Sequence, residues 1–378
     1  MSNNRLQQLQ DLGQSIWLDN IDRKMLHNGD LERRIREDAL TGMTSNPTIF
    51  EKALAEGSDY DDQLLSADPG LTPEQLFELV ETTDVQRACD IFGGVYQKTR
   101  GGDGYVSIEV SPGVANDSRM SVDEACRLWK TVDRPNVMVK IPGTEQGAIA
   151  VRDLISRGIN VNITLLFSLE AHARVIDAYM FGLEDRVGRG EPIDGIFSVA
   201  SFFVSRVDTE VDKRLDAMIK TAKPDDADRL RLLKGRAAIA NAKLAYSLFT
   251  ERFAAERWKT LAEKGGRVQQ PLWASTGVKN PEYRDVIYVE ELTGPNTVNT
   301  MPPKLIDAFR DHGVVERTVD KRLGAAEGLL HEVEAVGISM KDVTDTLLRE
   351  GLASFQKSFD SLTAGIARKM SALVPTTK

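Results

Sequence analysis

The sequence has few of the features that mark secreted, membrane-spanning or metal-binding proteins. It contains 2 cysteines, Cys89 and Cys126, which lie far apart and form neither a disulfide framework nor a metal-binding spacing. No apolar run approaches the roughly 18 residues that a membrane span needs. The start, "MSNNRLQQLQDLG", lacks the charged beginning and apolar middle of a signal peptide. We therefore expect a cytoplasmic protein without a membrane partner.

Basic residues are also scarce, with 48 Lys and Arg against 57 Asp and Glu and a formal net charge of −9. Binding nucleic-acid phosphates needs a basic surface, so we expect no nucleic-acid partner. Phosphorylated small molecules stay open as ligands, provided that cations gather locally. The chain has no Walker-type phosphate loop, no HExxH motif and no EF-hand loop, and its 4 histidines form no metal or triad pattern. We expect neither a metal nor an organic cofactor.

What the sequence does contain is an alternation of short β-like runs and longer amphipathic stretches. Of its 378 residues, 41% are hydrophobic and 28% are charged, as in soluble globular proteins. Eight runs are predicted strands: 15–21, 39–46, 105–112, 136–143, 160–168, 195–203, 269–276 and 297–303. Alternating strands and helices predict parallel pairing. An open doubly wound sheet would carry a glycine-rich fingerprint after its first strand, and "WLDNIDRK" has none. We therefore predict an α/β fold, a (β/α)8 TIM barrel.

Helical patterns fill the spaces between these runs. Residues 72–100 are a predicted helix with Pro73 at its first position and a capping box formed by Thr72 and Gln75. Ser168 is the predicted cap of the helix at 168–187. Two regions exceed a minimal barrel: a helical insertion at 207–268 and a helical tail at 314–378. No Gly, Ser or Pro-rich linker separates them, so we predict a catalytic barrel over 1–313 and a C-terminal extension packed on it.

Chemistry in such a barrel belongs at the carboxyl ends of the strands, which are unusually polar here. The polar residues at these ends are Asp19, Asn46, Glu109, Lys140, Asn162, Thr164, Ser201 and Ser275. Each has an ordinary alternative: Lys140 could reach water at a frayed strand end, Asp19 and Asn46 could cap helices, and Glu109 could be an ion-pair partner. Together they suit Schiff-base chemistry, in which a lysine amine attacks a ketone and the resulting iminium assists cleavage of a neighbouring C–C bond.

Several segments in order resemble the transaldolases, which are Schiff-base enzymes of the non-oxidative pentose phosphate pathway. They are "TSNPTIF", "SIEVSP", "VMVKIPGT", "NVNITLLFS" and "SVASFFVSRVD", and the resemblance covers residue 16 to about residue 303. It implies reversible transfer of a dihydroxyacetone unit from sedoheptulose 7-phosphate to glyceraldehyde 3-phosphate, giving erythrose 4-phosphate and fructose 6-phosphate. The insertion and tail resemble a longer bacterial branch of the family. A homodimer is compatible with the sequence, which does not determine the oligomeric state.

The resemblance also implies roles for individual residues. Lys140 matches the Schiff-base lysine, and Asp19 matches the base that takes the proton from the C4 hydroxyl. Glu109 matches the carboxylate that serves carbinolamine formation and dehydration through a water also held by Thr164. Asn46 and Asn162 match the amides that hold the dihydroxyacetone hydroxyls, and Ser201 and Arg206 match the phosphate site, where a guanidinium can bind phosphate oxygens as a fork.

One segment departs from the family pattern. Transaldolases commonly carry "ASFR" after the seventh strand, with an arginine that binds phosphate, whereas this chain has "ASTGVKNP". Either Lys279 or Ser275 could replace that arginine, or Lys279 could be a solvated loop lysine. Two rival functions stay open: a related fructose 6-phosphate aldolase, and a barrel that binds sugar phosphates without turnover. The aldolases carry glutamine and tyrosine at the places of Glu109 and Phe203, so both positions favour the transferase.

Overall fold

The computed structural model describes residues 4–55 and 57–373, and its centre is a closed barrel of eight parallel strands in chain order. The strands are β1 (Gln14–Asp19), β2 (Leu40–Thr44), β3 (Tyr105–Glu109), β4 (Val137–Pro142), β5 (Val161–Leu166), β6 (Ser198–Phe203), β7 (Gln270–Ala274) and β8 (Thr297–Met301). Pairing of β1 with both β2 and β8 closes the ring. The predicted barrel is confirmed. Seven strands lie within their predicted runs, and β1 begins one residue before its run of 15–21.

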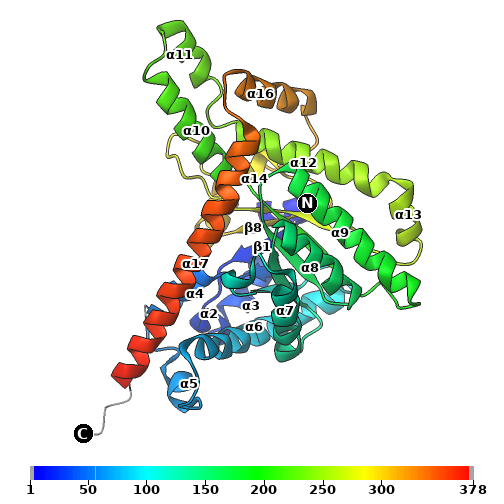
Figure 1. Cartoon of the computed structure of the whole chain (residues 1–378), viewed down its shortest axis with the longest axis vertical. Coiled ribbons are helices and arrows are strands. Elements are labelled where there is room, and N and C mark those ends of the chain that lie inside the picture. The colour runs from blue at the N-terminus through cyan, green and yellow to red at the C-terminus, as the bar shows by residue number, and fades with distance from the viewer. Residues whose placement is uncertain (1–3, 56, 374–378) are drawn as a thin grey trace.

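Helices surround this barrel (Figure 1). They are α1 (Arg5–Asp11), α2 (Arg23–His27), α3 (Asp30–Glu37), α4 (Pro47–Ala55), α5 (Asp61–Ser66), α6 (Pro73–Lys98), η1 (Pro112–Val114), α7 (Ser118–Val132), α8 (Glu145–Ser156), α9 (Leu169–Gly188), α10 (Ser205–Ile219), α11 (Pro224–Arg231), α12 (Ala237–Ala254), α13 (Glu256–Ala262), α14 (Ile287–Glu291), α15 (Pro303–His312), α16 (Leu323–Ala335) and α17 (Met340–Leu373). No helix of the described chain combines the length and the apolar character that crossing a membrane requires.

Local signals in the sequence set the starts of the two long helices as predicted. At α6, the Thr72 side chain accepts a hydrogen bond from the Gln75 backbone N–H, and the Gln75 side chain accepts one from the Thr72 backbone N–H. At α9, the Ser168 hydroxyl accepts a hydrogen bond from the Ala171 backbone N–H. These caps satisfy helix donors that otherwise have no partner. The cap at Ser168 therefore starts α9 directly after β5, and the cap at Thr72 starts the helix α6 that leads to β3.

The strands are short apolar runs because both of their faces are buried. Every residue of β3, β4, β5, β6 and β8 is buried. Helices cover the outer face of the barrel, and side chains from alternate positions fill its interior, as expected of parallel sheets. This packing is what holds the polar side chains at the carboxyl ends in fixed positions.

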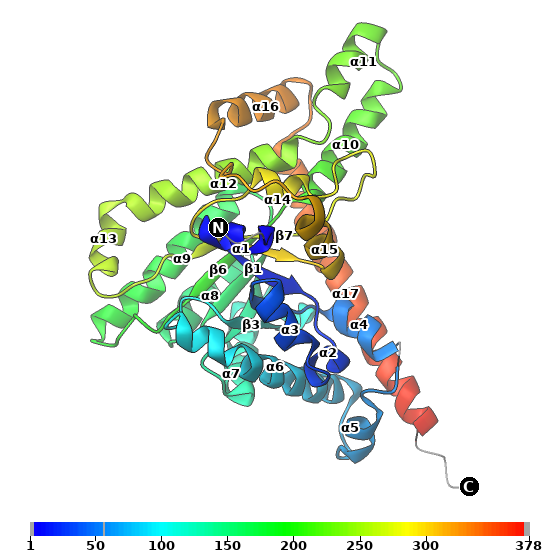
Figure 2. The ribbon, with the colours of Figure 1, turned by 180° about the vertical axis from the view of Figure 1, so that it is seen from behind.

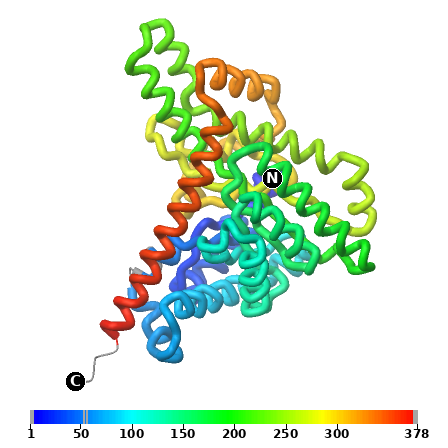
Figure 3. The backbone as a smooth tube through the Cα atoms, viewed as in Figure 1, coloured from blue at the N-terminus to red at the C-terminus, as the bar shows by residue number. Residues whose placement is uncertain are grey.

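The two predicted helical additions are both present. The insertion forms α10 to α13, and Figures 1 and 2 show α10 and α11 projecting from the barrel at one end of the molecule. The tail forms α16 and the 34-residue α17, which contacts α4, α6, α10 and the end of β5. Figure 3 shows α17 as one long rod that passes along the molecule. The division into a barrel over 1–313 and an extension from 314 stays a prediction.

Candidate active site

A cavity of about 690 Å³ opens at the carboxyl ends of the strands. Nine of the predicted site residues line it: Asp19, Asn46, Lys140, Thr164, Ser201, Phe203, Arg206, Ser275 and Lys279. Glu109 and Asn162 lie just behind this lining. A larger cavity of about 780 Å³ lies between the starts of α8 and α9 and the helix α17, away from Lys140. The predicted residues therefore gather in one place, although they come from most of the strands.

Lys140 and Glu109 are direct neighbours across the β3–β4 pair. The Lys140 ammonium donates hydrogen bonds to Glu109 Oε2 and to the Ser45 backbone carbonyl, both at 3.0 Å. Each of the two residues is only 6% exposed. A buried lysine needs a paired charge, and Glu109 supplies it. Lys140 therefore does not lie at a frayed strand end.

Asp19 ends β1 beside Thr44 of β2, which is its register partner. The Thr44 hydroxyl donates a hydrogen bond of 3.0 Å to Asp19 Oδ1. Burial raises the pKa of Asp19 above its usual range, and the positive charge of Lys140 opposes that rise. Asp19 caps no helix, because the cap of α2 is Asp22. A carboxylate with a raised pKa close to a lysine is a stronger base than an exposed one.

The pKa of Glu109 is also raised, chiefly by burial, with Lys140 lowering it and the charge of Asp19 raising it further. Two carboxyl groups with raised pKa values therefore lie near one amine. Such an arrangement is typical of acid–base chemistry rather than of a structural ion pair.

Asn162 lies inside the barrel beside Lys140, its register partner on β4. It is fully buried, donates a hydrogen bond to Ser107 Oγ at 3.0 Å and accepts one from Ser201 Oγ at 2.7 Å. Ser201 lines the cavity. The network fixes the orientation of the Asn162 amide, which reaches the cavity through Ser201.

Thr164 follows two residues later and is 1% exposed. Its hydroxyl is buried without a hydrogen-bond partner among the described residues, and its side chain lines the cavity. The next residue, Leu165, has a φ of 59°, where the β5–β6 register shifts. A bulky residue in the left-handed region is strained, and such strain concentrates at functional sites. The strained backbone holds an unsatisfied hydroxyl beside Lys140.

Asn46 follows β2, and its side-chain oxygen accepts a hydrogen bond from the Ile49 backbone N–H at 3.1 Å. Asn46 therefore caps the helix α4, which was the ordinary alternative to a role in catalysis. The same side chain also lines the cavity. Both roles are met together, because the cap uses the amide oxygen and leaves the amide nitrogen for the cavity.

Arg206 lies in the first turn of α10, directly after β6. Its guanidinium is 5.2 Å from the centre of the Phe203 ring and has no hydrogen bond or ion pair within the described residues. Burial lowers the pKa of Arg206, and the charge of Asp19 opposes that shift. The result is a cation at the cavity wall that forms no direct ion pair in the described chain, on an acidic protein.

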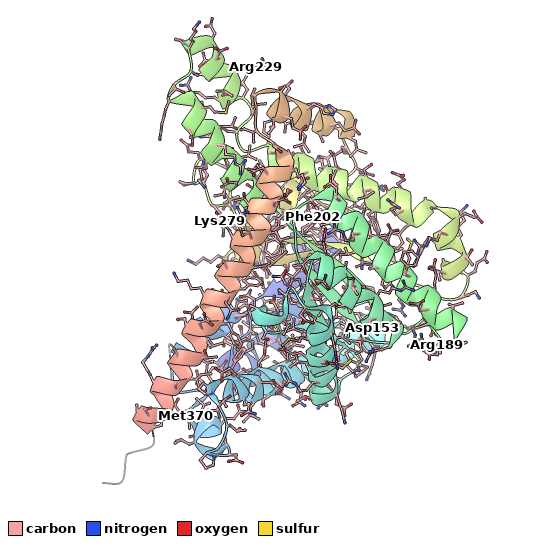
Figure 4. All side chains as sticks on the ribbon, viewed as in Figure 1. Asp153, Arg189, Phe202, Arg229, Lys279 and Met370 are labelled. Carbon is pink, nitrogen blue, oxygen red and sulfur yellow. The ribbon has the colours of Figure 1, made fainter. Side chains whose placement is uncertain are left out.

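The segment that departs from the family pattern also lies at the cavity, next to the start of α10. Ser275 has a φ of 56°, and its hydroxyl lies 3.0 Å from that of Ser205 at the start of α10. Lys279 also lines the cavity, but its side chain is exposed and forms no ion pair in the described part of the chain. Figure 4 labels Lys279 on the same side of the molecule as α10.

One further residue completes the cavity and was not among those predicted from the sequence. Phe355 comes from the middle of α17, is 6% exposed and lines the same cavity. Gly351, one turn earlier on the same helix, lies against Leu165 and Arg206. Phe355 lies more than 50 residues beyond the segments with recognisable motifs, so only its apolar position on a helix could have pointed to it. The described residues contain no group of three or more His, Cys, Asp or Glu that could hold a metal ion.

Fold and cavity together define the class: a TIM-barrel enzyme with a polar cavity at the carboxyl ends of its strands. The sequence profile of the family "Transaldolase/Fructose-6-phosphate aldolase" matches residues 16–366. The chain therefore belongs to the transaldolase/fructose-6-phosphate aldolase family. The predicted resemblance is confirmed, and it extends past residue 303 into α17, further than the motifs indicated.

Curated relatives agree over nearly the whole chain. A protein named Transaldolase from Thermobifida fusca (strain YX) is 47% identical over 369 residues, covering 97% of this chain and 98% of that protein. A Transaldolase from Arthrobacter sp. (strain FB24) is 48% identical and covers 94% and 95% of the two chains. A Transaldolase from Trichodesmium erythraeum (strain IMS101) is 43% identical and covers 99% and 100%.

Proposed function

We propose that this chain is a transaldolase, which transfers a dihydroxyacetone unit from sedoheptulose 7-phosphate to glyceraldehyde 3-phosphate. The products are erythrose 4-phosphate and fructose 6-phosphate, and the reaction is reversible. Family membership and full-length relatives of that name support the activity. One observation supports the chemistry most directly: the buried Lys140 amine faces the cavity and is paired with Glu109 at 3.0 Å.

The first step is formation of the iminium on Lys140. Its ammonium gives a proton to Glu109, along the hydrogen bond of 3.0 Å, and the free amine attacks the ketone carbon. The attack gives an ammonium alkoxide, and one nitrogen proton passes to its oxygen to give the carbinolamine. Glu109 then returns the proton that it took to the carbinolamine hydroxyl, which leaves as water while the C=N bond forms. The unsatisfied Thr164 hydroxyl is available to bind this water. No proton is exchanged with solvent in this sequence.

The second step is cleavage of the C3–C4 bond. Asp19 takes the proton of the C4 hydroxyl, the aldehyde leaves, and the bonding electrons move into the iminium to give a neutral enamine. The raised pKa of Asp19 suits it to accept and later return this proton. Addition of the second aldehyde follows the same path in reverse. In this proposal Asn46 and Asn162 hold the dihydroxyacetone hydroxyls, Asn162 with the help of Ser201.

Arg206 is the proposed anchor of the substrate phosphate, with Ser201 beside it. The guanidinium forms no direct ion pair in the described chain, so a phosphate dianion in the cavity could pair with it. Ser275 and Lys279 are the proposed second contacts. A cytoplasmic location, a homodimer and the lack of nucleic-acid and membrane partners stay predictions, which cell fractionation, light scattering and binding assays would test.

The test of this function is whether glyceraldehyde 3-phosphate formation depends on an acceptor. With fructose 6-phosphate alone, we expect about one equivalent of glyceraldehyde 3-phosphate per active site, because the enamine stays on Lys140 until an acceptor aldehyde adds to it. Adding erythrose 4-phosphate should start sustained turnover to sedoheptulose 7-phosphate. Fast continued release without an acceptor would identify a fructose 6-phosphate aldolase instead, and no release in either case would favour a non-catalytic binder.

A further inference from the structure

A second cavity lies on the other side of the Lys140–Glu109 pair from the candidate site. It has a volume of about 440 Å³ and lies between α6, α7, the segment after β3 and α17. Glu109 lines this second cavity and not the first, whereas Lys140 lines the first and not the second. The ion pair of 3.0 Å therefore forms the wall between the two cavities.

Glu81 of α6 lines the second cavity together with Glu109. It is 4% exposed and has no hydrogen bond or ion pair within the described residues. A buried carboxylate without a partner is costly, so this side chain needs an explanation. Glu109 has an open position as well, because only its Oε2 accepts a hydrogen bond from Lys140 and its Oε1 has no partner in the described chain.

The next buried acid on the same helix shows that Glu81 is not an ordinary structural residue. Asp84 is 1% exposed, but its carboxylate accepts hydrogen bonds from Arg23 at 2.7 Å and from the Tyr60 hydroxyl at 3.0 Å. Glu81 has no comparable contact, although it lies on the apolar stripe of α6 between Phe77 and Val85, which are both buried. A hydrophobic residue would fit that position better if packing were its purpose.

The charges around Glu81 decide its protonation state. Burial and then the charge of Glu109 raise the pKa of Glu81 well above its usual range, with further contributions from Glu78 and Glu124, while Lys140 opposes them. Arg127 of α7 is paired with Glu78 at the outer rim, and Glu124 is held by the Ser111 backbone N–H and hydroxyl. The residue that α17 contributes to this cavity is Phe359, which carries no charge. Burial beside other acids therefore favours the protonated form of Glu81.

We propose that Glu81 is a positioning residue for the reaction, a carboxylic acid that shares its proton with Glu109 while the Lys140 nitrogen is neutral in the enamine. This inference rests on the proposed function. The Lys140 nitrogen is positive in the resting ammonium and in the iminium, and Glu109 then has a cation beside it. It is neutral in the enamine, and Glu109 then becomes a buried carboxylate without a counter-ion.

Proton sharing within the acid pair lowers that cost, because it spreads the negative charge over two carboxyl groups. As the enamine forms, the proton of Glu81 moves to Glu109 or is shared with it through water in the second cavity, so the pair keeps one proton and a net charge of −1 through cleavage and addition. When an aldehyde adds and the iminium returns, the proton moves back to Glu81. Two carboxyl groups that share a proton in this way titrate as one unit. Glu81 would thus stabilise the enamine, which in a transferase must persist until the second aldehyde binds.

The test uses Glu81→Ala and Glu81→Gln, with Glu78→Gln as a matched control one turn earlier on α6, where the carboxylate is paired with Arg127. We expect Glu81→Ala to lower kcat for transfer to erythrose 4-phosphate about 10- to 100-fold, with KM for fructose 6-phosphate nearly unchanged. Losing a donor to ionised Glu109 raises its pKa, so the acidic limb of the kcat profile, which reports the enzyme–substrate complex, should move up by about one pH unit. Glu81→Gln should show a smaller shift, because its amide can still donate.

Formate distinguishes proton sharing from a structural role. Sodium formate should restore activity to Glu81→Ala several-fold, through the space left in the second cavity, whereas sodium chloride at equal ionic strength should not. Activity of both variants within twofold of wild type, or a loss with an unmoved acidic limb and no formate rescue, would overturn the inference. If Glu81→Ala does not fold, the acidic limb of Glu81→Gln decides alone, and an unmoved limb counts against the proposal. Wild-type enzyme that fails to transfer would instead refute the proposed function.

Discussion

Replacing Arg206 separates a role in substrate binding from a role in folding. The comparison uses fructose 6-phosphate and fructose, which differ only in the phosphate that Arg206 is proposed to bind. The guanidinium lines the cavity, contacts the Phe203 ring at 5.2 Å and has no counter-ion in the described chain. Arg206→Ala therefore removes a contact to substrate without leaving an unpaired carboxylate behind. A charge-assisted hydrogen bond contributes roughly 1.5–3 kcal/mol, which corresponds to about 10- to 150-fold in affinity.

We expect KM for fructose 6-phosphate to rise by that factor, while the weak turnover of unphosphorylated fructose hardly changes. Inorganic phosphate should inhibit the wild type competitively and the variant much less. Arg206→Lys should lie between the two, because an ammonium binds phosphate as a point charge. Arg174→Ala is the control, since that arginine lines the other, larger cavity. Equal losses for both sugars, together with a lower Tm, would refute a phosphate site and indicate a folding role.

Three further substitutions test the surroundings of the cavity. Lys279→Ala should raise KM for fructose 6-phosphate by no more than about fivefold, because an exposed lysine contributes up to about 1 kcal/mol, and no change would remove it from the site. Phe203→Tyr should increase the release of free dihydroxyacetone at the expense of transfer, since the added hydroxyl can orient water or relay a proton to the enamine, and an unaltered product ratio would contradict this. Phe355→Ala should weaken the packing of α17 by about 3–5 kcal/mol and lower Tm, with Phe355→Leu losing much less, and a variant with the wild-type Tm would show that α17 does not depend on this contact.

The barrel was predictable because its signals are local. Short apolar runs that end in polar residues mark the buried parallel strands, and the capping residues Thr72 and Ser168 mark where the helices begin. Lys140, Glu109 and Asp19 were recognisable because each breaks an apolar run at the end where a barrel places its chemistry. Their convergence then follows from the closed topology.

Residues on helices were harder to predict. Glu81 lies among other acids in "ELVETTD", and only its spacing of four from Phe77 and Val85 distinguishes it from a surface residue. Phe355 is one apolar residue on a long amphipathic helix, and nothing local shows that α17 reaches the barrel mouth. The pairing of Asn162 with Ser201 also needs the structure, because it depends on side chains that meet inside the ring.

The central claim is that Lys140 carries the substrate covalently. Borohydride added with fructose 6-phosphate should reduce the iminium and leave a ketose or dihydroxyacetone adduct on the tryptic peptide that contains Lys140, identified by tandem mass spectrometry. Lys140→Arg should give neither adduct nor activity, and borohydride without the sugar should leave the peptide unmodified. An adduct on another lysine would contradict the account. So would complete inactivation of the wild-type enzyme by borohydride and fructose 6-phosphate without any adduct on the Lys140 peptide.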